Sequence, residues 1–267
     1  MAQLSSDDVE RFVHDGFVRL EAAFPTEVAA RCVDELWMLL DEDRHDPSTW
    51  TAPVLRIGGA ASPAIVEAIN TDRLIAAVDD LVGVGRWQRR RGYGSFPVRF
   101  PSEQDPGDAG WHIDGSYPVG DEPPPWNYWV NLWSRGRALL VLMLYSDVGD
   151  DDAPTRLRVG SHLDVARTLT RYGEEGASFV EVSQATTSAD RRTAASATGL
   201  AGDAYLCHPF VMHAATFPHR GTQPRFLGQP AIEFTPPADR YDYERPRADL
   251  SPCERAVRIA LDTRSSS

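Results

Sequence analysis

Apolar residues in the first third of the chain recur at helical spacing. Phe12 and Val13 follow Val9 after a serine pair that can cap a helix, and Gly16 predicts where this helix ends. The same spacing returns further on, so residues 1–85 are expected to form a largely helical flank. The other elements expected here are a short strand over residues 17–20, a longer helix opened by Pro25, and one or two helices between Ile65 and Val82.

From Trp87 onward, short runs rich in Val, Leu, Tyr and Trp alternate with clusters of Gly, Pro and Asp. This texture is typical of antiparallel strands joined by turns. Eight short strands can remove their exposed edges by closing into a barrel or a jelly roll, which predicts a mainly β core over residues 86–235. The expected strands are Gly92–Phe100, Gly110–Asp114, Tyr128–Leu132, Ala138–Ser146, Thr155–Val159, Ala204–Cys207, Met212–Ala215 and Arg225–Phe234.

A C-terminal helix from Pro252 to Leu261 and a serine-rich tail should complete residues 236–267. The length of 267 residues suits one domain that combines the helical flank, the β core and this helix.

Composition narrows the class of protein. No apolar run reaches the roughly 18–20 residues of a membrane span, and the formal net charge of −12 argues against nucleic acid or an anionic membrane as a partner. Three cysteines without a close pair argue against a disulfide framework and are typical of a cytoplasmic protein. A basic cluster, Arg86 with Arg89 to Arg91, is interpreted as solvated surface that could still attract an anionic substrate.

The sharpest local motif is Trp111-His112-Ile113-Asp114-Gly115. Residues two apart on a strand share a face, so His112 and Asp114 should project together while Ile113 points away. An imidazole beside a carboxylate supplies two ligands of the three-ligand face that holds Fe(II) in many oxygenases. By itself the pair could also be a histidine hydrogen-bonded to a neighbouring aspartate.

The segment from Gly202 to Ala215 offers two candidates for a third ligand. Pro209 interrupts the chain directly after His208, which places His208 near a turn. His213 lies on the apolar run that follows, where a strand residue can face the inside of a barrel. We favour His213 as the ligand and interpret His208 as a polar residue near the site.

Arg225 opens a predicted strand twelve residues after His213. A dicarboxylate needs a planar cation that can bind its carboxylate through two hydrogen bonds, and guanidinium suits this better than ammonium. Arg225 could otherwise form an ordinary surface ion pair. Arg220 is a weaker candidate because it falls within the turn Pro218–Pro224.

Six segments follow one another in a characteristic order: Phe12–Val18, Trp111–Gly115, Arg158–His162, Gly202–Tyr205, His213 and Pro224–Arg225. Together they resemble the phytanoyl-CoA dioxygenase family of Fe(II)- and 2-oxoglutarate-dependent oxygenases. This resemblance spans almost the whole chain. It implies a double-stranded β-helix, a cupin-like jelly-roll barrel, with an N-terminal helical layer. Within that fold Gly160-Ser161-His162 would be the turn after a barrel strand, with His162 structural.

The resemblance implies that His112, Asp114 and His213 bind Fe(II), and that Arg225 binds the distal carboxylate of 2-oxoglutarate. Such a dioxygenase consumes O2 and 2-oxoglutarate, releases succinate and CO2, and hydroxylates or otherwise oxidises a small to medium organic metabolite. Because Asp114 is present, oxygenation is expected rather than halogenation, which becomes possible where a small residue stands in its place. Thr155 is a candidate second contact to the cosubstrate, although a threonine there also suits a plain strand.

Substrate contacts and assembly are less constrained by the sequence. Trp126 and Trp129 follow the metal motif closely and are candidate substrate contacts, whereas aromatic clusters more often belong to a core. The chain is compatible with a monomer or a homodimer. An alternative reading is a metal-binding cupin-like barrel without oxygenase activity, which would not require Arg225. No G-x-S-x-G, P-loop or dinucleotide-binding motif occurs.

Overall fold

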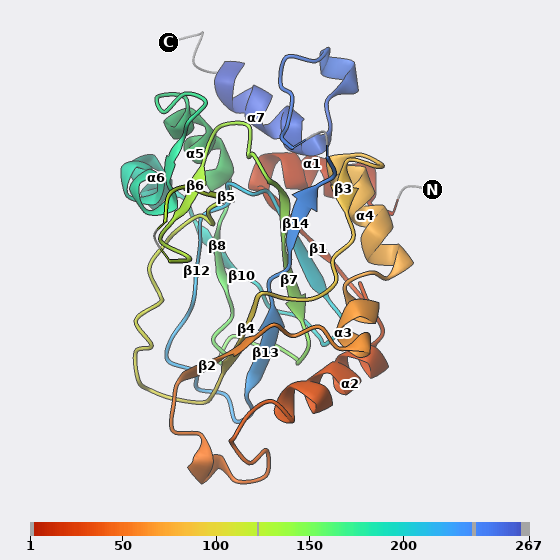
Figure 1. The fold of residues 1–267 in the computed structure, drawn as a ribbon, viewed down its shortest axis with the longest axis vertical. Coiled ribbons are helices and arrows are strands. Elements are labelled where there is room, and N and C mark those ends of the chain that lie inside the picture. Colours follow the sequence, from red (N-terminus) through yellow and green to blue (C-terminus); the bar gives the residue numbers. More distant parts are fainter. Residues whose placement is uncertain (1–2, 122, 237–238, 263–267) are drawn as a thin grey trace.

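Antiparallel sheets form the centre of the molecule, and helices cover the outer side of the largest sheet (Figure 1). The structure is a computed structural model that describes residues 3–121, 123–236 and 239–262. Its helices are α1 (Ser6–Asp15), α2 (Thr26–Trp37), α3 (Pro63–Ala68), α4 (Asp72–Val82), α5 (Ser161–Leu169), α6 (Phe179–Ala185) and α7 (Pro252–Asp262), with short 3-10 turns at Pro47–Thr49, Thr187–Arg191 and Arg247–Asp249.

The largest sheet has the strand order β1-β11-β7-β13-β4-β2, and β14 pairs with both β7 and β3. Two smaller sheets have the orders β10-β8-β12 and β5-β6-β9. The strands are β1 (Phe17–Leu20), β2 (Val54–Gly58), β3 (Trp87–Gln88), β4 (Ser95–Arg99), β5 (Tyr117–Pro118), β6 (Tyr128–Val130), β7 (Arg137–Leu144), β8 (Arg156–Arg158), β9 (Ala177–Ser178), β10 (Ala194–Ser196), β11 (Ala204–Cys207), β12 (His213–Ala214), β13 (Arg225–Gly228) and β14 (Ala231–Phe234).

Strand β7 divides the hydrophobic core into two clusters, because successive side chains of a strand point to opposite faces. Leu140, Leu142 and Leu144 pack with residues of the sheet β10-β8-β12, including Leu157, and enclose the inside of the barrel, which we call the lumen. The other face of β7 packs into the larger cluster with the apolar sides of α2, α3 and α4.

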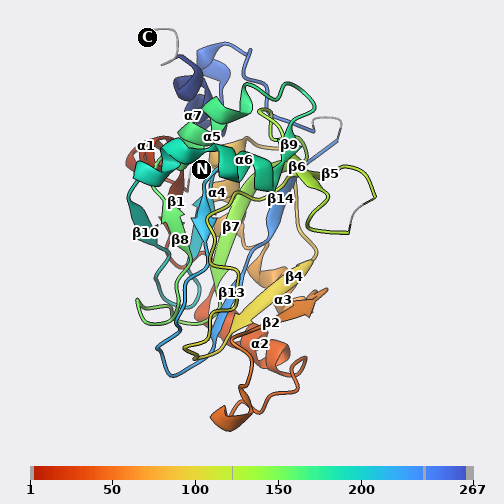
Figure 2. The same cartoon turned by 90° about the vertical axis from the view of Figure 1, so that its left-hand side faces the viewer.

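The remaining helices lie at one end of the barrel. Figure 2 shows α5 and α6 across one end, near α7, whereas α2 lies near the other end. In the sequence, α5 follows β8 directly. Gly160 makes this junction with a left-handed φ of 74°, a conformation that glycine adopts without strain.

The structure confirms the prediction of a mainly β core with flanking helices. Helix α1 is capped as predicted: the Ser5 side chain accepts a hydrogen bond from the N–H of Asp8, and Gly16 ends the helix with φ 88°. The three cysteines are free and buried. None of the helices within the described ranges could span a membrane.

Several expected boundaries were wrong. Residues 225–234 are two strands, β13 and β14, because Pro230 between them has no N–H for continuous pairing. Residues 110–114 form an isolated bridge at His112 rather than a full strand. Gly160 is a turn residue, but Ser161 already begins α5, and neither α5 nor α6 was expected.

Candidate active site

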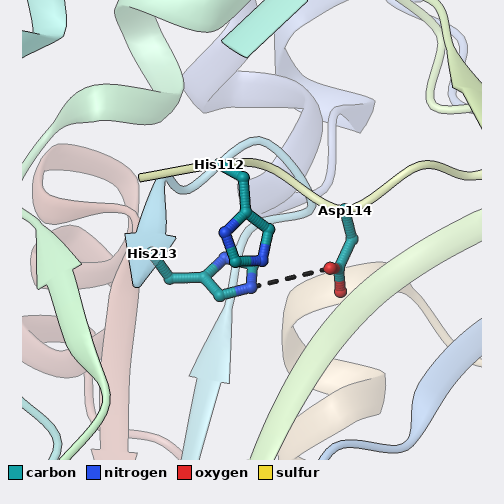
Figure 3. A group of neighbouring side chains, drawn as sticks. All are labelled: His112, Asp114 and His213. Atoms are coloured by element: carbon teal, nitrogen blue, oxygen red, sulfur yellow. Dashed lines mark ion pairs between the residues drawn. The ribbon is translucent and has the colours of Figure 1, made fainter. Parts of the chain in front are cut away.

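His112 and His213 face each other across a pair of backbone hydrogen bonds. The N–H of His112 donates to the carbonyl of His213 at 3.0 Å, and the N–H of His213 donates to the carbonyl of His112 at 2.8 Å. Residues directly opposite in an antiparallel pair project to the same side. The two imidazole rings therefore lie together, with their centroids 4.5 Å apart (Figure 3).

Both imidazoles are oriented by backbone carbonyls. Nδ1 of His112 lies 2.9 Å from the carbonyl oxygen of Gly110, and Nδ1 of His213 lies 3.1 Å from that of Val211. Because a carbonyl can only accept, the proton of each neutral ring belongs on Nδ1. The lone pair of Nε2 is then free for a metal ion, which is how ligating histidines are usually held.

The two imidazoles differ in pKa. Burial, and then the neighbouring His213, lower the pKa of His112, which favours its neutral form. Burial also opposes charge on His213, but the nearby Asp114 carboxylate outweighs it and raises the pKa of His213. The difference in pKa between the two histidines therefore arises from the Asp114 carboxylate, which acts more strongly on His213.

Asp114 completes the cluster and uses its two oxygens differently. Oδ1 lies 3.6 Å from Nε2 of His213, the contact drawn in Figure 3. Oδ2 accepts a hydrogen bond of 2.6 Å from Nη1 of Arg137. Burial alone would raise the pKa of Asp114, but Arg137 and the two histidines hold it well below its usual range, so the group is a carboxylate.

The ligand atoms of His112, Asp114 and His213 all lie within 4.8 Å of one another. Two imidazole nitrogens and one carboxylate oxygen on one side form the donor set that suits Fe(II) with open positions for further ligands. The residues present therefore fit the metal that the sequence predicts.

Sequence reasoning missed Arg137, which reaches the cluster because of a β-bulge. Glu233 of β14 pairs with Arg137 and Ile232 pairs with Leu139, so Ala138 is an extra residue on β7. Simple alternation would turn Arg137 away from the lumen. The extra residue instead turns it to the same side as Leu140, toward Asp114, and bulges commonly redirect side chains in this way beside functional sites.

Arg225 is buried in the lumen, with 2% of its surface exposed. It lies directly opposite Arg99 of β4, which is also buried. Nη1 of Arg225 donates to the carbonyl of Ala153, and its Nε has no partner among the described residues. Burial, and then Arg99, lower the pKa of Arg225 to about 9. A buried cation beside another cation is stabilised by an anionic ligand, so this arrangement fits a carboxylate of 2-oxoglutarate.

Thr155 is buried immediately before β8. Its carbonyl accepts a hydrogen bond from the N–H of Ala197, a member of the lumen cluster. The residue two positions on, Leu157, also faces the lumen, so alternation directs the Thr155 side chain inward. Its contact with a cosubstrate stays a prediction.

The other polar candidates lie outside the cluster. His208 is buried against the carbonyl of Cys253, and Nε2 of His162 lies 3.1 Å from the carbonyl oxygen of Val13. Ser161 has a supporting role, since its hydroxyl accepts the N–H of Met212 at 2.9 Å, next to His213. Arg220 has an exposed side chain 3.8 Å from Glu103.

A cavity of about 650 Å³ opens beside Asp114 and Arg137. Tyr117 and Tyr128 of the β5–β6 hairpin line it, together with Phe234 of β14. Trp126 and Trp129 are not among the lining residues: Trp126 is 60% exposed and stacks near Phe179. A role for these tryptophans in substrate binding stays a prediction, whereas Tyr117 and Tyr128 are the aromatic residues of this hairpin that line the cavity.

Solved structures share this fold at low sequence identity. HygX from Streptomyces hygroscopicus, with nickel and 2-oxoglutarate bound, is 19% identical, with a TM-score of 0.54 and 88% of each chain covered. EctD from S. alaskensis, with 2-oxoglutarate and 5-hydroxyectoine, is 16% identical, with a TM-score of 0.51, and covers 90% of this chain and 79% of its own. SnoK, a non-heme alpha ketoglutarate dependent carbocyclase from nogalamycin biosynthesis, is 14% identical, with a TM-score of 0.55. The match covers 88% of this chain and 86% of SnoK. These likenesses show the jelly-roll fold.

The sequence comparisons give the family. No curated protein matches the chain in a sequence search. A family model described as phytanoyl-CoA dioxygenase (PhyH) matches residues 12–227, which include every residue of the cluster and Arg225. The chain therefore belongs to the phytanoyl-CoA dioxygenase family, the family of Fe(II)- and 2-oxoglutarate-dependent oxygenases that its sequence motifs resemble.

Proposed function

We propose that His112, Asp114 and His213 hold Fe(II), that Arg225 binds the distal carboxylate of 2-oxoglutarate, and that the enzyme hydroxylates a small to medium organic molecule. The convergence of three ligand atoms within 4.8 Å carries the proposal. The buried guanidinium of Arg225 in the same lumen, whose Nε has no partner among the described residues, supports binding of the cosubstrate. HygX and EctD, which share the fold, were solved with 2-oxoglutarate bound.

When bound, iron with 2-oxoglutarate would allow O2 to oxidise a C–H bond: one oxygen atom enters the substrate as a hydroxyl group and the other enters succinate, with release of CO2. The protein contributes position and environment. The carbonyls of Gly110 and Val211 fix the imidazole rings, and Arg137 holds one oxygen of Asp114 so that the other faces His213. The leucines of the lumen keep the inside of the barrel apolar.

Asp114 favours hydroxylation or a related oxidation over halogenation, and the pocket indicates the size of the substrate; neither point follows from the fold. Proteins of this fold include a carbocyclase, SnoK, and an epimerase, SnoN. A carboxylate at position 114 fills the place that a halide would need, which favours oxygenation. The cavity of about 650 Å³ suits a small or medium organic molecule.

An anaerobic titration tests the metal and the cosubstrate together. Chelation of Fe(II) by 2-oxoglutarate gives a weak absorption band at about 500 nm, which the wild-type protein should develop. Arg225→Ala should require roughly 100-fold more 2-oxoglutarate, because losing a charge-assisted contact costs about 3 kcal/mol.

Arg220→Ala is the matched control, since it removes an exposed arginine from the preceding turn. It should titrate as the wild type does. Fe(II) binding without any band would favour a metal-binding barrel of different chemistry, and equal titrations of Arg225→Ala and the wild type would remove Arg225 from the proposal.

A further inference from the structure

The cavity beside Asp114 adjoins a second one. That second cavity has a volume of about 920 Å³ and is lined by Arg89, Arg90 and Arg91, the cluster that the sequence marks as basic. The two cavities share the lining residues Gln88, Arg90, Gly94 and Glu233. The two cavities therefore adjoin, and we call them together the cleft, which extends from Asp114 to a rim at residues 89–91.

This cleft has a charge opposite to that of the whole protein. The lining side chains include five arginines (Arg56, Arg89, Arg90, Arg91 and Arg137) and two carboxylates (Asp114 and Glu233). The chain as a whole has a formal net charge of −12. A positive, concave surface in an acidic protein concentrates anions selectively at that place.

The arginines at the base and middle of the cleft are already engaged. Arg137 binds Asp114 at 2.6 Å, and Arg90 binds Glu233 at 2.6 Å where the two cavities join. The backbone at Arg90 is held as well, because Nδ2 of Asn70 donates to its carbonyl at 2.8 Å. These contacts give the segment that carries the rim a defined position.

The rim arginines are different. Arg89 and Arg91 are exposed, and their side chains make no hydrogen bond or ion pair with the residues that the structure describes. Guanidinium groups bind carboxylate and phosphate oxygens through paired hydrogen bonds. Two such groups, free and at the outer end of a cleft that reaches the metal ligands, are placed to receive an anionic group.

We propose that the substrate is an organic anion whose carboxylate or phosphate binds Arg89 and Arg91, with its oxidised carbon lying beside Asp114. This inference rests on the proposed function, because it takes the cleft to be the substrate site of the oxygenase. The aromatic residues Tyr117, Tyr128 and Phe234 line the inner cavity and suit an apolar or ring-shaped part of the same molecule.

Calorimetry on the anaerobic protein loaded with Fe(II) and saturated with 2-oxoglutarate tests the proposal. The probes are phenyl phosphate and phenylacetate, with benzyl alcohol as the neutral counterpart. Saturation with 2-oxoglutarate ensures that the anionic probes do not bind in the site for 2-oxoglutarate itself. Phenyl phosphate or phenylacetate should bind more tightly than benzyl alcohol, and affinity should fall as salt rises.

The double variant Arg89→Gln/Arg91→Gln should weaken anion binding roughly tenfold, as expected for two exposed charge contacts. Arg11→Gln/Arg44→Gln is the matched control, because it removes the same charge from residues that line neither cavity. Tight binding of phenyl phosphate alone would identify a phosphate ester, and of phenylacetate alone a carboxylic acid.

The absorption band at about 500 nm is recorded on the same samples, so the two proposals are separable. The band should be unchanged in both double variants. A normal band with no preference for anions, or with equal anion affinity in the two double variants, would overturn the assignment of the substrate and leave the proposed function intact. An absent band in the wild type would overturn the proposed function itself.

Discussion

Arg99 and Arg225 lie directly opposite each other on β4 and β13, buried on the same side of the sheet. Two described carboxylates act on the pair. Asp108 accepts a hydrogen bond of 2.6 Å from Arg99 and also binds Arg56 at 2.7 Å, and the charge of Asp152 acts on Arg225 from beyond hydrogen-bonding distance. Arg225 has no acidic partner within hydrogen-bonding distance among the described residues. Arg225 therefore has no direct anionic partner in the lumen, although it lies beside a second buried cation.

From this arrangement we expect Arg99→Gln to weaken 2-oxoglutarate binding. The variant removes one buried positive charge near Arg225, and a Coulomb attraction at partly screened distances is worth about 1 kcal/mol. The 2-oxoglutarate needed for half of the 500 nm band should rise roughly fivefold, less than for Arg225→Ala. Arg56→Gln, which removes the exposed partner of Asp108, serves as the control. An unchanged titration for Arg99→Gln would mean that Arg99 serves only Asp108.

Arg137→Gln tests how Asp114, the proposed carboxylate ligand, is positioned. The substitution removes the donor to Oδ2 of Asp114, which should lower Fe(II) affinity roughly tenfold, as loss of a partner of a metal ligand commonly does. Removing a positive charge near the metal should by itself raise Fe(II) affinity. The loss of a fixed orientation for Asp114 should outweigh this effect, because the proposed site has only three protein ligands. Fe(II) affinity is measured by anaerobic calorimetry without 2-oxoglutarate, and Arg137→Lys should recover part of it. Tighter binding of Fe(II) by Arg137→Gln would show that charge repulsion dominates.

The cluster of His112, Asp114 and His213 could be predicted from sequence because each signal is local or ordered. His112 and Asp114 stand two residues apart, and His213 lies on an apolar run where an inward-facing residue is expected. Arg137 could not be predicted in the same way. Its direction depends on the bulge at Ala138, which exists only once β14 has paired with β7.

The same distinction holds for the fold. Helix α1 carries its own stop signal in Gly16, so its end could be predicted. Strands such as β5 and β9 are two residues long and are defined only by their partners on β6. No periodic pattern can develop over so short a segment, and their positions follow from tertiary pairing rather than from local preference.

Gly16→Ala should destabilise the protein by about 3 kcal/mol, because two penalties coincide. The φ of 88° disfavours a side chain, and a Cβ atom would lie 2.4 Å from Nδ1 of His162. Gly59→Ala separates the two effects, since Gly59 has φ 66° but no atom within 4 Å of the added Cβ. In urea unfolding, Gly59→Ala should lower the free energy of unfolding by about 1 kcal/mol. Equal losses in the two variants would mean that the contact with His162 relaxes without cost.

His162 should make the fold sensitive to mild acid. Its side chain is fully buried, and burial lowers its pKa to about 4 although the carbonyl of Val13 partly opposes the shift. In the unfolded chain the same group takes up a proton near its ordinary pKa of about 6.5. Its contribution to the free energy of unfolding is therefore complete above pH ~6.5, falls as the pH drops toward 4, and is lost below that value.

When the pH falls from 7.5 to 4.5, His162 alone should lower the free energy of unfolding of the wild type by about 2 to 3 kcal/mol, since each unit of pKa difference is worth about 1.4 kcal/mol. His162→Asn should be less stable than the wild type at pH 7.5, because it loses buried packing, yet it should lose correspondingly less stability on acidification. Urea unfolding of both proteins at the two pH values gives the difference directly, and effects of the carboxylates common to both cancel. His45→Asn, at an exposed position, should keep the wild-type dependence. Parallel pH dependences of His162→Asn and the wild type would show that the buried imidazole accepts a proton without unfolding the chain.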